Sequence, residues 1–82
     1  MMKEQDVRQW IAGYIAELLD LAEDDIKPDR EFQEYGLDSA DAIIIGGALE
    51  ERFDTEIDAT LFLRNDNIDR LIADLARSGL LE

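Results

Sequence analysis

Three stretches of this sequence repeat apolar residues at the spacing of an α-helix, and this periodicity limits the chain to a helical fold. The first, roughly residues 4–21, places seven apolar residues on one stripe: Val7, Trp10, Ile11, Tyr14, Ile15, Leu18 and Leu19. The second covers residues 40–53 and presents Ile45, Leu49 and Phe53. The third follows Asn67, a good capping residue, stops at Gly79, and presents Ile68, Leu71, Ile72 and Leu75.

The segments between these helices are predicted to be one long loop and one short helix. Residues 22–37 lack helical periodicity and read as an irregular loop in which Ile26 and Phe32 are buried. The apolar residues of 57–63 indicate a short helix before the last one. The predicted fold is therefore all-α: a small helical bundle with three main helices and one short helix, and a long loop between the first two helices. It forms a single domain over residues 1–82 with a core of about 5–78.

Charge and composition exclude several classes of function. The chain has 21 Asp and Glu against 8 Lys and Arg, a formal net charge of −13, and neither His nor Cys. Without those two residue types it lacks the usual near-neutral base, a thiolate nucleophile and the common zinc ligands, so an enzyme is not expected. The charge disfavours nucleic acid and anionic membranes and favours a basic protein surface. With no membrane span or secretory signal, we expect a cytoplasmic protein.

The chain contains two serines, and they lie in different contexts. Ser78 precedes Gly79 and is typical of a polar helix end. Ser39 follows Gly36-Leu37-Asp38 at the start of the second predicted helix, where Asp38 and Ser39 are both good N-cap residues. Spacing alone favours a capping role for Ser39.

A longer sequence pattern around Ser39 indicates a role other than capping. Residues 32–39 read Phe-Gln-Glu-Tyr-Gly-Leu-Asp-Ser, which is an aromatic residue, a short spacer and then Gly-hydrophobic-Asp-Ser. The pattern continues with Leu-Glu-Glu-Arg-Phe within residues 48–57. It ends with residues 59–68, which lead into the last predicted helix. Over roughly residues 7–76 the chain resembles the acyl carrier protein and peptidyl carrier protein family.

The resemblance implies that Ser39 is an attachment point for 4′-phosphopantetheine rather than a catalytic nucleophile. In the family, a phosphopantetheinyl transferase moves this arm from coenzyme A to the serine oxygen, using magnesium held partly by the preceding aspartate, here Asp38. The arm brings the thiol that the chain lacks and holds an acyl or aminoacyl group as a thioester. The expected protein is a free-standing monomeric carrier, serving loading ligases and downstream synthase or transferase enzymes of fatty-acid, polyketide, peptide or related biosynthesis.

The resemblance also implies that partners dock on the second helix. The acidic candidates for contact with basic partner surfaces are Asp41, Glu50, Glu51, Asp54, Glu56 and Asp58. The apolar candidates are Ala40, Ile43, Ile44 and Gly47. Ala40, Ile44 and Gly47 depart from the residues that the family commonly has at these positions. The departure has two alternative explanations, altered partner specificity or drift on a tolerant surface.

A function from another class is also consistent with these residues. The chain would then be an unmodified acidic adaptor or inhibitor that binds a basic protein surface, and Ser39 would only cap the helix. A calcium-binding loop that starts at Asp20 fails because Asp25 stands where glycine is needed and Pro28 falls at the ninth position. Gly46 and Gly47, each costing about 1 kcal/mol relative to Ala in mid-helix, suggest a gap beside Ile45, Leu49 and Phe53 that shelters a short acyl chain.

Overall fold

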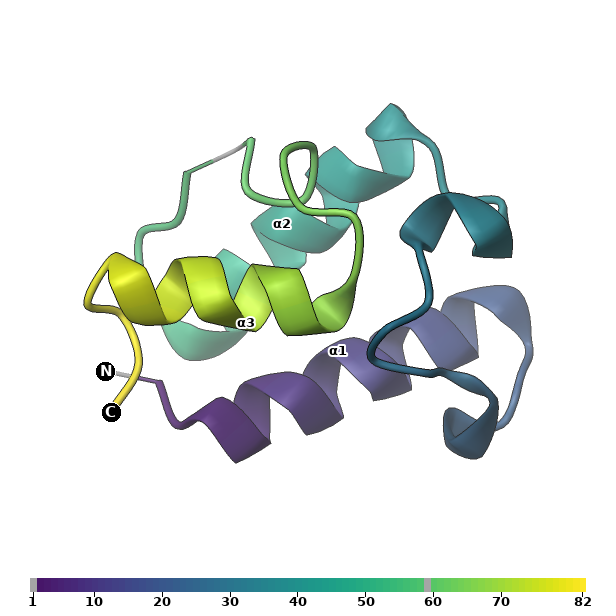
Figure 1. Ribbon diagram of the computed structural model, residues 1–82, viewed down its shortest axis with the longest axis horizontal. Helices are drawn as coiled ribbons and strands as arrows, with labels where there is room; N and C mark the ends of the chain where they lie inside the picture. Colours follow the sequence, from purple (N-terminus) through teal and green to yellow (C-terminus); the bar gives the residue numbers. More distant parts are fainter. Residues whose placement is uncertain (1, 59) are drawn as a thin grey trace.

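Among the described residues, the fold consists of three α-helices and two short 3₁₀ helices (Figure 1). The computed structural model describes residues 2–58 and 60–82; Met1 and Ala59, which begins the stretch 59–68 noted above, lie outside the described residues. The α-helices are α1 (Glu4–Leu19), α2 (Ser39–Phe53) and α3 (Ile68–Arg77), and the loop after α1 contains the 3₁₀ helices η1 (Glu23–Asp25) and η2 (Phe32–Tyr35). The all-α prediction with three main helices is confirmed. None of the described helices is long and apolar enough to cross a bilayer.

The predicted apolar stripes form the core where the helices face one another. Val7, Ile11 and Ile15 of α1 are fully buried, as are Ile45 and Leu49 of α2 and Leu71 and Leu75 of α3. Burying a side chain of this size stabilises the fold by about 1.5–3 kcal/mol. The prediction for Leu18 is wrong, since it is 49% exposed. Leu18 lies in the last turn of α1, which ends at Leu19.

The long loop is anchored by buried side chains and by hydrogen bonds to the start of α3. Ile26 and Phe32 are buried, as predicted. The Phe32 N–H donates to the Asp66 carbonyl at 2.7 Å, and the Asp69 N–H donates to the Pro28 carbonyl at 3.0 Å. Within the loop, the Tyr35 hydroxyl accepts from the Lys27 N–H at 2.8 Å. These contacts hold η2 in a fixed place between the start of α2 and the start of α3.

Where a short helix is predicted before α3, residues 60–64 form a single hydrogen-bonded turn. The Leu63 and Arg64 N–H groups donate to the Thr60 carbonyl at 2.9 and 3.0 Å. The Asp58 carboxylate accepts from the Thr60 N–H and hydroxyl, and the Asn65 amide donates to the Leu61 carbonyl. Such side-chain bonds compete with the backbone bonds that a helix needs. Leu61 and Phe62 are nevertheless buried.

A buried carboxylate joins this turn segment to α3. Asp74 is 8% exposed and accepts from Arg64 Nε and Asn65 Nδ2, each at 2.8 Å. The Arg64 guanidinium, followed by the Asn65 amide, lowers the pKa of the Asp74 carboxyl. Because both partners come from the segment between α2 and α3, this cluster fixes that segment against α3.

The two ends of the chain lie side by side (Figure 1). The Met2 N–H donates to the Leu80 carbonyl at 3.0 Å, and the Glu82 N–H donates to the Met2 carbonyl at 2.8 Å. Gly79 ends α3 as predicted: at φ 75° it allows the Leu80 N–H to reach the Leu75 carbonyl at 3.0 Å.

Alanine substitution should have opposite effects on stability at Gly47 of α2 and at Gly36, the residue that follows η2. A Cβ at Gly47 would meet open space in a regular helix, so Gly47→Ala should raise the free energy of unfolding by about 0.5–1 kcal/mol. Gly36 has a φ of 82°, so Gly36→Ala should lower it. Urea denaturation followed by circular dichroism measures both changes. A loss of stability in Gly47→Ala would contradict the helical environment described for this residue.

Candidate functional site

Ser39 is the first residue of α2 and lies at the surface. The N-cap is Asp38, whose Oδ1 accepts from the Asp41 N–H at 3.0 Å, while Asp41 Oδ2 accepts from the Asp38 N–H at 3.1 Å. This reciprocal pair satisfies donors that a helix start otherwise leaves unpaired. In the described part of the chain the Ser39 hydroxyl makes no hydrogen bond. The capping interpretation of Ser39 is therefore wrong, because Asp38 is the N-cap.

The surroundings of Ser39 combine a helix N-terminus with negative charge. The helix dipole and the remaining N–H groups of the first turn favour an anion bound to Ser39. The Asp41 N–H lowers the pKa of the neighbouring Asp38 carboxyl, which therefore stays ionised at neutral pH. Asp38 consequently offers a negative charge beside the hydroxyl, where a cation brought by another molecule would be attracted. A covalent phosphodiester at Ser39 fits this position.

Three of the six acidic docking candidates have structural partners. Asp41 belongs to the cap pair, and Glu50 Oε2 accepts from the Ile57 N–H at 2.8 Å. Asp58 binds the Thr60 N–H and hydroxyl and also Arg64, and these contacts lower the pKa of its carboxyl to about 2. The charges of Asp41, Glu50 and Asp58 therefore help to hold the fold.

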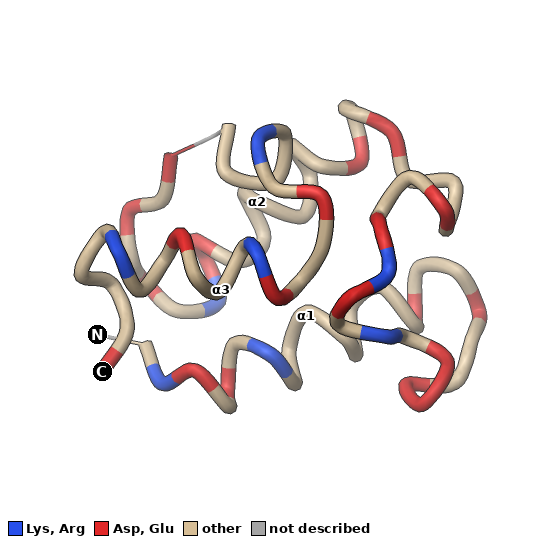
Figure 2. Tube along the Cα trace, viewed as in Figure 1, with Lys and Arg blue, Asp and Glu red and all other residues tan. Residues whose placement is uncertain are grey.

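The other three acidic candidates lie together at the end of α2. Glu51, Asp54 and Glu56 are exposed, and within residues 2–58 and 60–82 none of their carboxylates has a hydrogen-bond or ion-pair partner. With Gly47, Glu50 and Thr55 they line a shallow hollow of about 460 Å³. We call Glu51, Asp54 and Glu56 the acidic cluster. Arg52, the single basic residue of α2, has its guanidinium carbon 4.9 Å from the centroid of the Phe53 ring. Along the whole trace, acidic positions outnumber basic ones (Figure 2).

The apolar docking candidates lie closer to Ser39. Ile43 and Ile44 are 53% and 58% exposed, and Ala40 and Gly47 are also at the surface. Leu63 is 46% exposed in the turn segment and lines the pocket beside Ser39, yet the sequence interpretation did not select it. The sequence feature that could have indicated Leu63 is the apolar triplet Leu61-Phe62-Leu63. A turn cannot bury three consecutive side chains, so one of them is expected at the surface.

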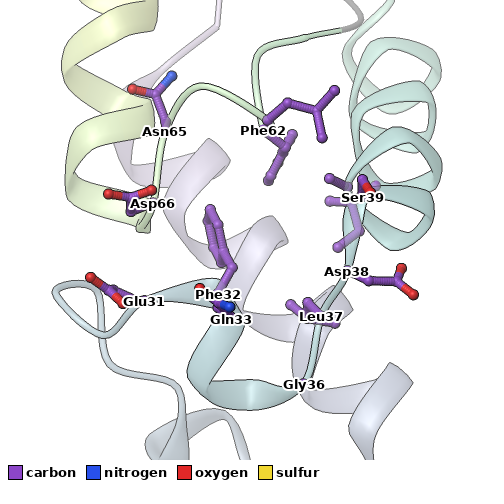
Figure 3. A pocket seen from close by; sticks show the side chains of 13 residues that line it. Glu31, Phe32, Gln33, Gly36, Leu37, Asp38, Ser39, Phe62, Asn65 and Asp66 are labelled. Carbon is purple, nitrogen blue, oxygen red and sulfur yellow. The ribbon is translucent and has the colours of Figure 1, made fainter.

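The apolar space predicted from Gly46 and Gly47 has a different position. A Cβ on Gly46 would lie 3.6 Å from Phe62 Cδ2, so the Phe62 ring already fills that side, and Gly47 faces outward. A pocket of about 430 Å³ lies instead between η2, the start of α2 and the turn segment (Figure 3). Ser39 and Ile45 line this pocket, whereas Leu49 and Phe53 do not.

Among the described residues, no group of three or more acidic residues is arranged to hold a metal ion.

Comparison with protein families identifies one match over most of the chain. The family model described as a phosphopantetheine attachment site matches residues 9–75. The acyl carrier protein TtuC of Teredinibacter turnerae is 34% identical over 67 residues, which cover 82% of this chain and 77% of that protein. A phenolphthiocerol/phthiocerol polyketide synthase protein of Mycobacterium tuberculosis is 29% identical over 73 residues, 89% of this chain but 4% of that protein.

Two solved structures share the fold. An acyl carrier protein from Anabaena sp. PCC 7120 with a variant phosphopantetheinylation-site sequence has a TM-score of 0.80 at 28% identity, covering 95% of this chain and 91% of that one. A free-standing peptidyl carrier protein from an uncharacterized Acinetobacter baumannii secondary metabolic pathway has a TM-score of 0.78 at 28% identity, covering 93% and 95%.

Because Asp38 caps α2 and Ser39 does not, alanine substitutions at these two neighbouring residues should have different effects on stability. Ser39→Ala should change the free energy of unfolding by less than about 0.5 kcal/mol, because its hydroxyl bonds nothing. Asp38→Ala should lower the urea midpoint, because the Asp41 N–H loses its acceptor. An equal loss of stability in the two variants would show that Ser39 shares the capping role.

Proposed function

The chain belongs to the phosphopantetheine-binding carrier proteins, and on that premise we propose that Ser39 is the residue that carries its 4′-phosphopantetheine arm. Members of this family are non-catalytic carriers in acyl, polyketide and peptide biosynthesis, and a phosphopantetheinyl transferase modifies them. The observation that supports Ser39 is its exposed, unbonded hydroxyl at the first residue of α2, next to the Asp38 cap. The other serine, Ser78, is the C-cap of α3.

Each residue at the start of α2 has a separate part in this proposal. Ser39 Oγ would lose its proton and bond to the phosphorus next to pantetheine, while the pyrophosphate bond of coenzyme A breaks and adenosine 3′,5′-bisphosphate leaves. The first turn of α2 would stabilise the phosphodiester anion that stays on Ser39. Asp38 holds the helix start rigid and offers a carboxylate to the magnesium ion of the transferase. The arm supplies the thiol on which an acyl or aminoacyl group is carried as a thioester. We further propose that the carrier forms one domain with a core of about 5–78.

We propose that partner enzymes dock over α2 by two kinds of contact. The acidic cluster steers basic surfaces of the transferase, the loading ligase and the downstream synthase towards the protein. The exposed residues Ile43, Ile44 and Leu63 then provide apolar contact close to Ser39. Weak contacts of this kind favour rapid exchange between partners. Asp41, Glu50 and Asp58 act mainly in the fold, since their carboxylates are already bonded.

Enzymatic loading tests the attachment site. Apo protein incubated with coenzyme A, magnesium and a broad-specificity phosphopantetheinyl transferase should gain the mass of one phosphopantetheine group. Ser39→Ala should gain nothing, whereas the matched control Ser78→Ala should be modified normally. The measurement is intact-protein mass spectrometry. An unchanged wild-type mass would favour the unmodified adaptor, and a gain that persists in Ser39→Ala would exclude this attachment site.

Charge reversal tests the acidic cluster. Glu51→Lys/Glu56→Lys should slow modification by the transferase about ten-fold at low salt, because steering by opposite charges is lost. The control Glu17→Lys/Asp24→Lys makes the same change in net charge at exposed positions before α2. Initial rates at low and high salt separate steering from unfolding, since only steering is screened by salt. Equal slowing in the two double variants would contradict a local docking role.

A further inference from the structure

A buried carboxylate of α3 holds the two residues that follow Leu63 in the chain. Asp74 is 8% exposed, and its Oδ2 accepts from Arg64 Nε and from Asn65 Nδ2, each at 2.8 Å. The pKa of the Asp74 carboxyl is lowered by these donors, so the group is ionised at neutral pH. Hydrogen bonds to an ionised acceptor are stronger than those between neutral groups. We call Arg64, Asn65 and Asp74 the clamp.

The clamp has a firm support, because α3 is itself fixed to the core. Leu71 and Leu75 of α3 are fully buried. Asp69 of α3 also forms an ion pair with Arg8 of α1 at 2.8 Å. A bond to Asp74 therefore fixes its donor relative to the whole fold.

Leu63 has little regular structure of its own to hold it in place. Its N–H donates to the Thr60 carbonyl at 2.9 Å within the single turn of residues 60–64. Phe62, the residue before it, is buried, whereas Leu63 is 46% exposed and lines the same pocket as Ser39. Leu63 thus stands between a buried residue and two clamped ones, and the direction of its side chain depends on both.

We propose that Asp74 is a positioning residue for partner docking, because the clamp holds Leu63 beside Ser39 in the place where partner enzymes contact it. This inference rests on the proposed docking role of Leu63. A side chain that is held in place before the partner arrives loses less conformational entropy on docking. Asp74 is buried and acts only through its two donors. Loss of the clamp should therefore weaken docking and leave the transfer step at Ser39 unchanged.

Steady-state kinetics of a phosphopantetheinyl transferase test this role. Asp74→Ala removes the acceptor of both clamp bonds and should raise KM for the carrier about five-fold with kcat unchanged. Asp74→Asn should stay within about two-fold of wild type, because one amide oxygen can accept from both donors. The control Asp69→Ala removes the same charge from α3 but breaks the ion pair with Arg8, so KM should not change. An unchanged KM in Asp74→Ala, or equal increases in Asp74→Ala and Asp69→Ala, would overturn the inference.

A double-mutant cycle separates positioning from a general loss of structure. Leu63→Ala should itself raise KM, and adding Asp74→Ala to it should raise KM by less than about two-fold further, because the positioned side chain is already absent. The effect of Asp74→Ala should also persist at high salt, unlike that of Glu51→Lys/Glu56→Lys, since Leu63 makes an apolar contact. The same increase from Asp74→Ala in both backgrounds would contradict the proposal. If Leu63→Ala left KM unchanged, the docking role of Leu63 and this inference would both fail.

Two further measurements keep the result independent of folding and of the attachment site. Circular dichroism checks that each variant is folded. If Asp74→Ala unfolds, Asn65→Ala replaces it, because that variant breaks one clamp bond without a change of charge and should also raise KM. Intact mass after exhaustive loading should show one phosphopantetheine group on every variant. Full loading with an unchanged KM would refute only the positioning role, whereas a wild-type protein that gains no mass would overturn the attachment site and this inference together.

Discussion

The hydrogen bonds between Asp38 and Asp41 are the contact on which the proposed site depends. A helix start needs a side-chain acceptor, and Asp38 supplies it through Oδ1. Because this need is met one residue earlier, the Ser39 hydroxyl is left unbonded at the first position of α2. The loop anchors Phe32 and Leu37 are buried on the other side of this junction, which fixes where α2 begins. The reactive hydroxyl is therefore held on a rigid element although it makes no hydrogen bond itself.

The acidic residues that give the net charge of −13 include carboxylates bonded within the fold and carboxylates exposed at the surface. Asp74 is buried against Arg64 and Asn65, and Glu50 closes the end of α2 by binding the Ile57 N–H. These carboxylates connect elements of the fold, whereas the acidic cluster is left exposed. The missing cysteine agrees with the family assignment, because the prosthetic group brings the thiol. A small chain can in this way use its apolar residues for the core and leave recognition to charge and a few exposed apolar side chains.

Local patterns in the sequence were enough to predict what depends on neighbouring residues. The helical stripes apart from Leu18, the cap at Asn67, the end at Gly79 and the buried Ile26 and Phe32 are confirmed. The errors concern contacts that the local pattern does not contain. Asn65 and Asp58 bind backbone groups of the turn segment, which is a single turn rather than a regular helix, and the Phe62 ring covers Gly46. The choice of Asp38 over Ser39 as cap could not be made from sequence, because both residue types are good caps.

The most direct test of the account is to locate the arm by tandem mass spectrometry of proteolytic peptides from the loaded protein. We predict that the phosphopantetheine mass lies on the peptide containing residues 37–41 and that fragmentation assigns it to Ser39. A modified peptide that contains Ser78 instead, or modification of any residue other than Ser39, would contradict the central claim that capping by Asp38 leaves Ser39 free to carry the arm.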